Sequence, residues 1–219
     1  MTPKLVVFLA IGTLMMGLPI IFVAKKYEIR IWKACAGTLL LTIFGATGTL
    51  LMYYFENGKF GGLSFYGAVF LVPVAFIVIS LILQIPYGKI MDLCAIGECI
   101  MLALMKVHCI LGGCCLGRVL FTTDSGVPVL FPSREAEMAV AIILFAILLQ
   151  WALRKKRCGQ LYAWYLVLYG GTRFVLNIFR EAWVDREMFL PYGNIWSLVA
   201  LAIGTTWLIL LWGRREKKH

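Results

Sequence analysis

Charged side chains are scarce in this sequence. Only 15% of its 219 residues are Asp, Glu, Lys or Arg, whereas 62% are hydrophobic. A water-soluble domain carries about 25% charged and about 45–50% apolar residues. The apolar residues form runs of roughly 18–24 residues, each long enough to cross a hydrocarbon core of about 30 Å. The composition therefore excludes an ordinary soluble domain and predicts an all-α, polytopic membrane helix bundle.

Linkers, low-complexity segments and convincing internal repeats are also missing, which favours a single integral membrane domain over residues 1–219. The first apolar run, Leu5 to Val23, is followed by Lys25-Lys26 and not by an Ala-x-Ala-like cleavage site. We therefore expect a retained helix rather than a signal peptide. Seven transmembrane helices are expected, over residues 4–24, 32–54, 64–84, 90–111, 136–153, 160–179 and 194–213.

Acidic residues are few, and the net charge of +10 could suggest nucleic-acid binding. The basic residues argue against that function because they form short clusters between apolar runs, as they do at the cytoplasmic side of membrane proteins. The segments after spans one, three and five, with the C-terminal tail, hold thirteen Lys and Arg, against six on the opposite side and two inside spans. This asymmetry predicts an outer N-terminus and a cytoplasmic C-terminus.

The cysteine pattern excludes a secreted disulfide framework. The chain has seven cysteines, an odd number, and most of them lie inside apolar runs. Disulfide-rich secreted domains have even numbers at regular spacings. Most of these cysteines are therefore interpreted as small buried apolar residues.

Ionisable residues inside the expected spans are the first candidates for a functional site, because they are costly in a bilayer. At a rise of about 1.5 Å per residue, Lys106 lies about 25 Å and Arg173 about 21 Å above the cytoplasmic starts of their spans. Five polar residues share this outer depth: Tyr66, Lys106, His108, Glu137 and Arg173. In the fourth span, Asp92, Cys99 and Lys106 also share one helix stripe, because steps of seven return to nearly the same face.

Two interpretations of these charges remain open. Glu137 could simply neutralise Arg173 and fix the helix register. Two cations against one nearby carboxylate, however, leave positive charge that suits an anionic ligand, such as the phosphate of an outer-leaflet phospholipid.

The connection over residues 112–135 is the longest on the outer side. It contains Gly112-Gly113 and Cys114-Cys115, with apolar stretches at Val119–Phe121 and Val127–Phe131. A plain extracellular loop is one interpretation. The apolar stretches suggest instead that the segment folds back along the membrane surface, where non-helical backbone must be buried in protein or line a wet cavity.

Several segments contain motifs of a known kind. Residues 105–119, MKVHCILGGCCLGRV, resemble the signature G-R-x-G-N-F-x-N-x-E-x-x-G-R of the prolipoprotein diacylglyceryl transferase family and, more closely, the G-C-F-x-x-G-C-C-x-G of a short-chain branch of that family. Residues 131–137, FPSREAE, are similar to its H-P-S-Q-L-Y-E, and residues 169–180, YGGTRFVLNIFR, to its Y-G-x-x-R-x-x-x-E-x-x-R. Residues 61–67, GGLSFYG, stand where the family has Ser-Phe-His-Gly-Gly. The resemblance covers roughly residues 60–213, in the family's order, and the family's seven-helix topology with an outer N-terminus agrees with the charge count.

This resemblance implies an enzyme of the bacterial plasma membrane, with its site toward the outer leaflet. It would move the diacylglyceryl group of phosphatidylglycerol to the lipobox cysteine of an exported lipoprotein precursor, with no metal, organic cofactor or nucleic acid. The implied catalytic residues are Lys106, Arg173, Tyr66, His108 and Glu137. The implied substrate-binding residues are Arg180, Arg118, Arg134, Gly112, Gly113, Cys114, Asp92, Tyr169 and Asn177. We expect the Gly-Gly-Cys-Cys loop to line the site without forming a covalent intermediate.

The sequence departs from the family signature at several positions. Lys106 replaces an arginine, and lysine cannot grip a phosphate bidentately. The Asn and Glu of the first motif become Cys109 and Cys114, Tyr66 replaces a histidine, and Asn177 replaces a glutamate. Arg173, Arg180, Asp92 and Glu137 keep the expected residue type. These changes suggest a divergent paralogue whose donor lipid or acceptor differs.

Two other classes of function fit parts of the pattern. A membrane thiol oxidoreductase could use Cys114 and Cys115, although such enzymes normally use Cys-x-x-Cys. A small transporter could use Asp92, Glu98 and Lys106 as a proton path, although no inverted repeat or pair of discontinuous helices supports it.

Overall fold

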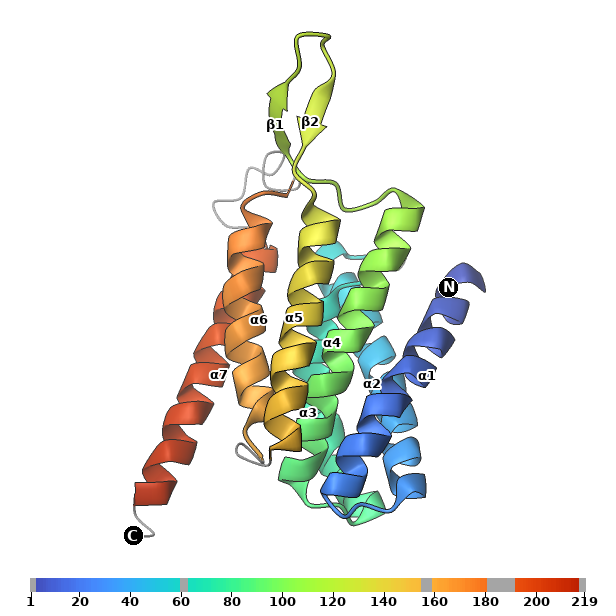
Figure 1. The fold of residues 1–219 in the computed structure, drawn as a ribbon, viewed down its shortest axis with the longest axis vertical. Coiled ribbons are helices and arrows are strands. Elements are labelled where there is room, and N and C mark those ends of the chain that lie inside the picture. Colours follow the sequence, from blue (N-terminus) through green and yellow to red (C-terminus); the bar gives the residue numbers. More distant parts are fainter. Residues whose placement is uncertain (1–2, 60–62, 155–158, 181–191, 217–219) are drawn as a thin grey trace. The chain divides into compact units, whose positions relative to one another are not determined.

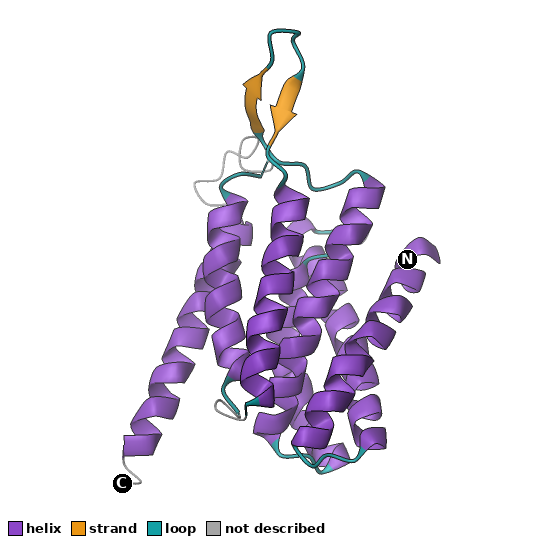
Figure 2. Ribbon diagram, viewed as in Figure 1, coloured by secondary structure: helices purple, strands orange, loops and turns teal. Residues whose placement is uncertain are grey.

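A computed structural model describes the backbone of residues 3–59, 63–154, 159–180 and 192–216. These residues form seven helices and one two-stranded sheet (Figures 1 and 2). The helices are α1 (Pro3–Lys26), α2 (Ile31–Asn57), α3 (Phe65–Leu83), α4 (Tyr87–Gly112), α5 (Ser133–Leu153), α6 (Leu161–Asn177) and α7 (Tyr192–Glu216). The strands are β1 (Val119–Thr122) and β2 (Pro128–Leu130).

The seven helices confirm the predicted all-α membrane bundle, and every predicted span coincides with one of them. Six of them are long and apolar enough to cross a membrane. The exception is α6, which has 17 residues, somewhat fewer than the roughly 20 that usually span a bilayer. Some of the cations counted for the topology, at 155–157, 186, 217 and 218, lie outside the described residues.

The chain divides into two compact units. Unit 1 comprises residues 1–102 and 145–162, and unit 2 comprises residues 103–144 and 163–219. In unit 1, α2 packs against both α1 and α3. Gly48 of α2 and Gly67 of α3 meet backbone to backbone, and a Cβ at either position would collide with the other's carbonyl group. Small residues at such contacts let helix backbones approach closely where the apolar solvent gives no hydrophobic drive for association.

Unit 1 is also held together by one buried carboxylate. Asp92 of α4 accepts hydrogen bonds from the Tyr27 hydroxyl at 2.9 Å, the Gly159 N–H at 2.6 Å and the Leu161 N–H at 3.0 Å. The N–H groups of the first helical turn have no partner within the helix, and Asp92 supplies one for Leu161 at the start of α6. Asp92 therefore ties α4 to the end of α1 and the start of α6.

In unit 2, α6 and α7 make a close contact at two glycines. A Cβ on Gly170 of α6 would lie 2.8 Å from the Ser197 carbonyl oxygen, and one on Gly204 of α7 would lie 2.8 Å from the Ala163 carbonyl oxygen. Through this contact α6, the helix that carries Arg173, packs against α7.

The connection between α4 and α5 forms an antiparallel β-hairpin of strands β1 and β2. All four β1 side chains are exposed, and the hairpin extends past the ends of α5 and α6 (Figure 1). The apolar stretches of this connection therefore pair with each other in a hairpin whose first strand is exposed, and its placement along the membrane surface stays a prediction. Strand pairing satisfies the backbone N–H and C=O groups of this segment without burial in the bundle.

Candidate functional site

Three helices of unit 2 bring together a buried ion cluster. Lys106 Nζ of α4 lies 2.5 Å from Glu137 Oε2 of α5. Arg173 of α6 forms an ion pair with the same carboxylate oxygen. All three side chains are buried. The structure therefore brings together three of the five residues that the sequence placed at one depth.

The charges in this cluster do not balance. One carboxylate faces two cations, which leaves one positive charge. Arg180, in the segment after α6, has its Nε buried without a hydrogen-bond partner among the described residues. Charges removed from water are stable only when they are paired and hydrogen-bonded. The cluster is therefore suited to an added anion.

The end of α4 explains how the glycines and cysteines of the next segment are arranged. Gly113 has φ +66°. The Cys114 N–H donates to the Cys109 carbonyl at 3.2 Å, and the Gly113 N–H donates to that of Ile110 at 3.4 Å. This pair of bonds, with a left-handed glycine between the helix and the next segment, is the Schellman motif. It folds Cys114 back over the last turn of α4, beside Cys109.

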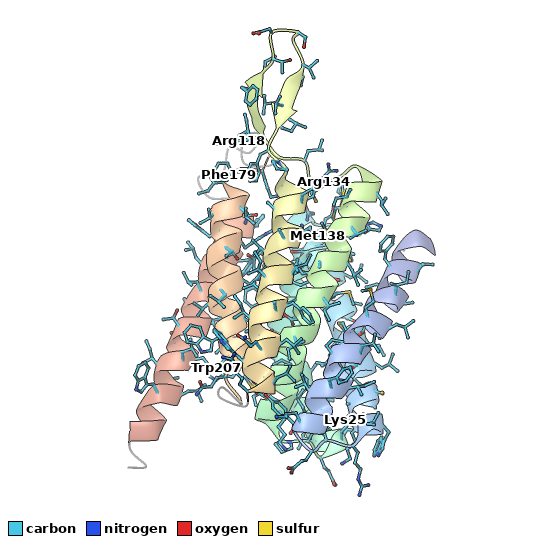
Figure 3. The ribbon with its side chains drawn as sticks, viewed as in Figure 1. Lys25, Arg118, Arg134, Met138, Phe179 and Trp207 are labelled. Atoms are coloured by element: carbon cyan, nitrogen blue, oxygen red, sulfur yellow. The ribbon has the colours of Figure 1, made fainter. Side chains whose placement is uncertain are left out.

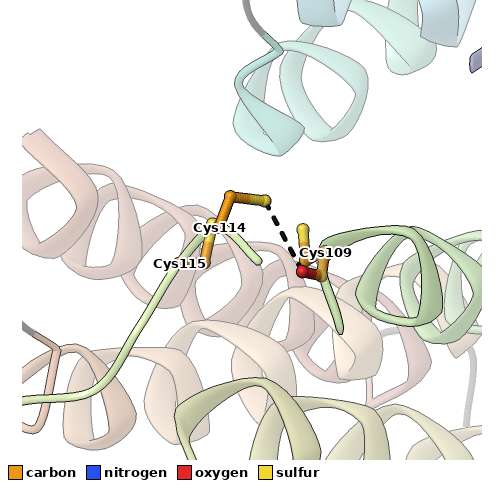
Figure 4. Close-up of side chains that lie close together, drawn as sticks. All are labelled: Cys109, Cys114 and Cys115. Atoms are coloured by element: carbon orange, nitrogen blue, oxygen red, sulfur yellow. Dashed lines mark hydrogen bonds between the residues drawn. The ribbon is translucent and has the colours of Figure 1, made fainter. Parts of the chain in front are cut away.

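The same turn creates a three-thiol cluster, which we define as Cys109, Cys114 and Cys115 (Figure 4). The three Sγ atoms lie within 4.8 Å of one another. The Cys114 thiol donates to the Cys109 carbonyl at 3.8 Å. All three cysteines are free thiols, and none is fully buried.

Cys115 has two unusual features. Its φ of +59° places a residue with a side chain in the left-handed region, a conformation that tends to persist at functional sites because the surrounding structure holds it. A hydrogen bond from the Cys109 thiol and the positive charges of Arg180 and Lys106 together lower the pKa of the Cys115 thiol to about 4.

The segment after Cys115 is fixed to the end of α6. The Arg118 N–H donates to the Phe179 carbonyl at 2.9 Å, and Gly117 forms an isolated bridge with Arg180. The Arg118 guanidinium lies over the Phe179 ring, 4.9 Å from its centroid, at the foot of the hairpin (Figure 3). These contacts hold the three-thiol cluster and Arg180 in the same part of unit 2.

Other predicted residues of unit 2 lie around these features in different environments. Tyr169 is buried on α6, with its ring stacked on Tyr165 at 5.4 Å. Asn177 is buried at the end of α6, and its Nδ2 has no hydrogen-bond partner among the described residues. Arg134 lies on the first turn of α5, 3.7 Å from the carboxylate of Glu135. His108 lies on the last turns of α4, half-buried.

Two predicted site residues, Tyr66 and Asp92, belong to unit 1. Tyr66 is buried on α3 and stacks on Phe70, with ring centroids 5.9 Å apart. Asp92 forms the three hydrogen bonds described above, which give it a structural role. The participation of either residue in substrate binding remains a prediction.

Sequence reasoning missed two parts of the arrangement. The proximity of Cys109 and Cys115 to Cys114 depends on the Schellman turn, and Gly113 directly after an apolar helix was a signal that could have predicted it. Asn194 of α7 is fully buried, with neither amide atom hydrogen-bonded to another described residue. An amide at the start of an otherwise apolar span was its signal.

These features define the chain as a polytopic membrane protein with a buried, cation-rich site near the ends of three helices. The sequence matches the family model for prolipoprotein diacylglyceryl transferase over residues 7–210. The chain therefore belongs to the prolipoprotein diacylglyceryl transferase family.

Relatives of known name agree with this assignment. The chain is similar to the phosphatidylglycerol–prolipoprotein diacylglyceryl transferase of Wolinella succinogenes, with 31% identity over 179 residues, which are 75% of this chain and 63% of the relative. The enzyme of the same name from Dehalococcoides mccartyi is 26% identical over 72% of this chain and 64% of the relative. That from Teredinibacter turnerae is 28% identical over 96% of this chain and 79% of the relative. The chain thus spans less than two thirds of the length of the first two.

Proposed function

We propose that this protein is a lipid transferase that moves the diacylglyceryl group of a phospholipid, phosphatidylglycerol by preference, to the cysteine thiol of an exported lipoprotein precursor. The relatives carry the names of these two substrates. The observation that carries the proposal is the buried Glu137 carboxylate between Lys106 and Arg173. Family membership favours this reaction over the thiol oxidoreductase and transporter hypotheses.

The reaction needs positive charge at the leaving group. A thiol attacks a glyceryl carbon, and glycerol phosphate leaves with the electron pair of the broken C–O bond. Arg173 and Lys106 would bind the phosphate and stabilise the charge that develops on it, and such preorganised electrostatic stabilisation is usually the largest contribution to catalysis. Before the lipid binds, Glu137 holds the two cations in place. The incoming phosphate would then compete with Glu137 for them.

The protein is expected in the bacterial plasma membrane, with the site toward the outer leaflet. The thirteen-to-six distribution of Lys and Arg supports this orientation. Reporter fusions after residues 28, 156 and 218 should report the cytoplasm, and fusions near 58, 124 and 187 the outside. A C-terminus on the outside would contradict the orientation and the depth assigned to Lys106 and Arg173.

A direct assay tests the reaction. Purified protein is incubated with labelled phosphatidylglycerol and a lipobox peptide, and the peptide is analysed by mass spectrometry. A diacylglyceryl thioether on the cysteine is the expected product, and a peptide with serine in place of cysteine is the matched control. Labelled phosphatidylethanolamine in a parallel reaction tests the donor headgroup. Unmodified peptide with every phospholipid, from protein shown to be folded, would contradict the proposal.

A further inference from the structure

The proposed transfer assigns no chemical step to the three-thiol cluster, although the geometry of the cluster is that of a set of metal ligands. The three Sγ atoms lie within 4.8 Å of one another. Three thiolates on a tetrahedral zinc ion lie about 3.8 Å apart, because each Zn–S bond is about 2.3 Å. Small side-chain rotations would therefore bring all three sulfurs to bonding distance of one ion.

We infer that Cys109, Cys114 and Cys115 bind one zinc ion and leave its fourth coordination position open. Thiolates are soft ligands that favour zinc and other thiophilic metals. Three protein ligands with an open fourth position is the pattern of catalytic zinc sites, whereas structural sites use four protein ligands. The family resemblance implies a reaction without a metal, so a zinc ion would be a difference from the family. Two of its proposed ligands, Cys109 and Cys114, are positions at which this sequence differs from the family signature.

The backbone places the ligands before any metal binds. The Schellman bonds of Cys114 and Gly113 fix Cys114 beside Cys109, and Cys115 follows in a left-handed conformation. Two residues later, Gly117 is bridged to Arg180. A site that is already assembled loses less conformational freedom on binding than one formed by a flexible loop.

The surrounding charge fits the proposed complex. Zinc with three thiolates carries one negative charge. Arg180 and Lys106 lie close enough to Cys115 to act on its charge, so they can offset the negative complex.

The open position has a natural occupant, an inference that rests on the proposed function. A thiolate is the nucleophilic form of cysteine, and a coordinating thiol is deprotonated. The acceptor cysteine would bind zinc as the fourth ligand. Its sulfur then forms the new S–C bond to the glyceryl carbon while the C–O bond to phosphate breaks. The thiol proton ends on the departing glycerol phosphate, and zinc remains in the same oxidation state throughout.

Metal content tests the site independently of the transfer reaction. Wild-type protein is purified in detergent under reducing conditions, loaded with zinc and measured by elemental analysis. About one zinc per chain is expected, with loss of this zinc in Cys109→Ser, Cys114→Ser and Cys115→Ser. Cys35→Ser is the matched control, because Cys35 is an exposed free thiol on α2 of unit 1, and it should keep the zinc. Zinc retained in all three cluster variants, no stoichiometric zinc in the wild type, or copper in its place would overturn the inference.

A second measurement needs no variant that might fail to fold. Zinc-loaded and chelator-treated wild-type protein are labelled with a maleimide and digested, and each cysteine is quantified by mass spectrometry. Zinc should protect Cys109, Cys114 and Cys115 together, while Cys35 is labelled equally in both samples. Equal labelling of the three thiols in both samples, or a disulfide among them in the reduced protein, would overturn the site.

Cobalt in place of zinc tests the fourth position. The thiolate-to-cobalt charge-transfer band should change when a lipobox peptide is added, and should not change with the serine peptide. If the charge-transfer band does not change when the cysteine peptide is added, the acceptor is not a ligand of the metal. Because none of these measurements monitors lipid transfer, a bound metal without transfer would reject the proposed function and retain the zinc site.

Discussion

Asp92 and Glu137, two of the buried carboxylates in the described part of the chain, have partners that differ in kind. Asp92 of unit 1 receives three neutral donors, a hydroxyl and two backbone N–H groups. Glu137 of unit 2 is held by two cations, Lys106 and Arg173. Neutral donors satisfy a carboxylate and leave nothing for a ligand, whereas two cations leave a positive charge that a phosphate can use. The kind of partner that a buried carboxylate has therefore decides whether it indicates a binding site.

Removing one cation from the Glu137 cluster should have the largest effect. Arg173→Ala should reduce turnover on the order of 100–1,000-fold, because it removes a donor aimed at the charge developing on the leaving phosphate. The measurement is transfer to the lipobox peptide, with thermal unfolding in detergent as the check of folding. Arg154→Ala, which removes an exposed cation at the end of α5, is the control. Wild-type turnover in Arg173→Ala would remove the basis for assigning the site to the cluster.

Removing the shared carboxylate should affect stability more than any change at Asp92. Glu137→Gln leaves two buried cations without their carboxylate, and breaking a buried ion pair from one side costs about 3–5 kcal/mol. We expect a clear fall in the thermal unfolding midpoint. The double variant Glu137→Gln with Arg173→Gln should recover part of the loss, since it removes one uncompensated charge. Equal stability of Glu137→Gln and the wild type would show that the cluster is solvated rather than buried.

The same change at Asp92 should cost less. Asp92→Asn keeps one acceptor oxygen but turns an NH₂ group toward N–H or O–H donors, and an unsatisfied buried group costs about 1–3 kcal/mol. Tyr27→Phe, which removes only one donor, should lose less than Asp92→Asn. Unfolding midpoints of both variants test this order. A raised KM in Asp92→Asn at unchanged stability would instead assign Asp92 to the substrate site, as the family resemblance implies.

Exchanging one cation for another should have the smallest effect. Lys106→Arg keeps the positive charge beside Glu137 and adds the planar fork that binds phosphate bidentately. We expect turnover equal to the wild type or higher, measured in the same peptide assay. Lys106→Met, which removes the charge and keeps an unbranched chain, is the matched comparison. Equal loss in both variants would mean that the position requires the lysine shape and not its charge.

Much of the fold was predictable because a bilayer imposes strict lengths on apolar runs. The spans and the seven-helix class follow from hydrophobicity alone. The shared depth of Lys106, Glu137 and Arg173 was also predictable, because helix rise converts residue number into height. The contacts among these three side chains depend on how each helix is rotated and packed. The spacing of residues along the sequence does not determine this rotation.

The hairpin and the role of Asp92 could not be predicted for a different reason. The apolar residues of β1, such as Phe121, suggested a segment that lies along the membrane surface, but they did not predict that β1 pairs with β2. The donors to Asp92 come from Tyr27, Gly159 and Leu161, which are distant in sequence, and two of them are backbone groups that carry no residue identity. A pattern of residue types cannot report such partners.

The attachment of the hairpin at its base has a consequence for how this region can vary. Arg118 and Gly117 are joined to Phe179 and Arg180 mainly through backbone atoms. Position 117 admits only glycine, because a Cβ there would collide with the Phe131 carbonyl group, so the base of the hairpin cannot vary freely. The tip, around Gly126, is exposed and turns with a left-handed glycine. Residues inserted there lengthen the hairpin without pulling on the α4 end or the three thiols. The tip is therefore the part of unit 2 where the chain can change length or accept an epitope while the chemistry beneath it stays intact.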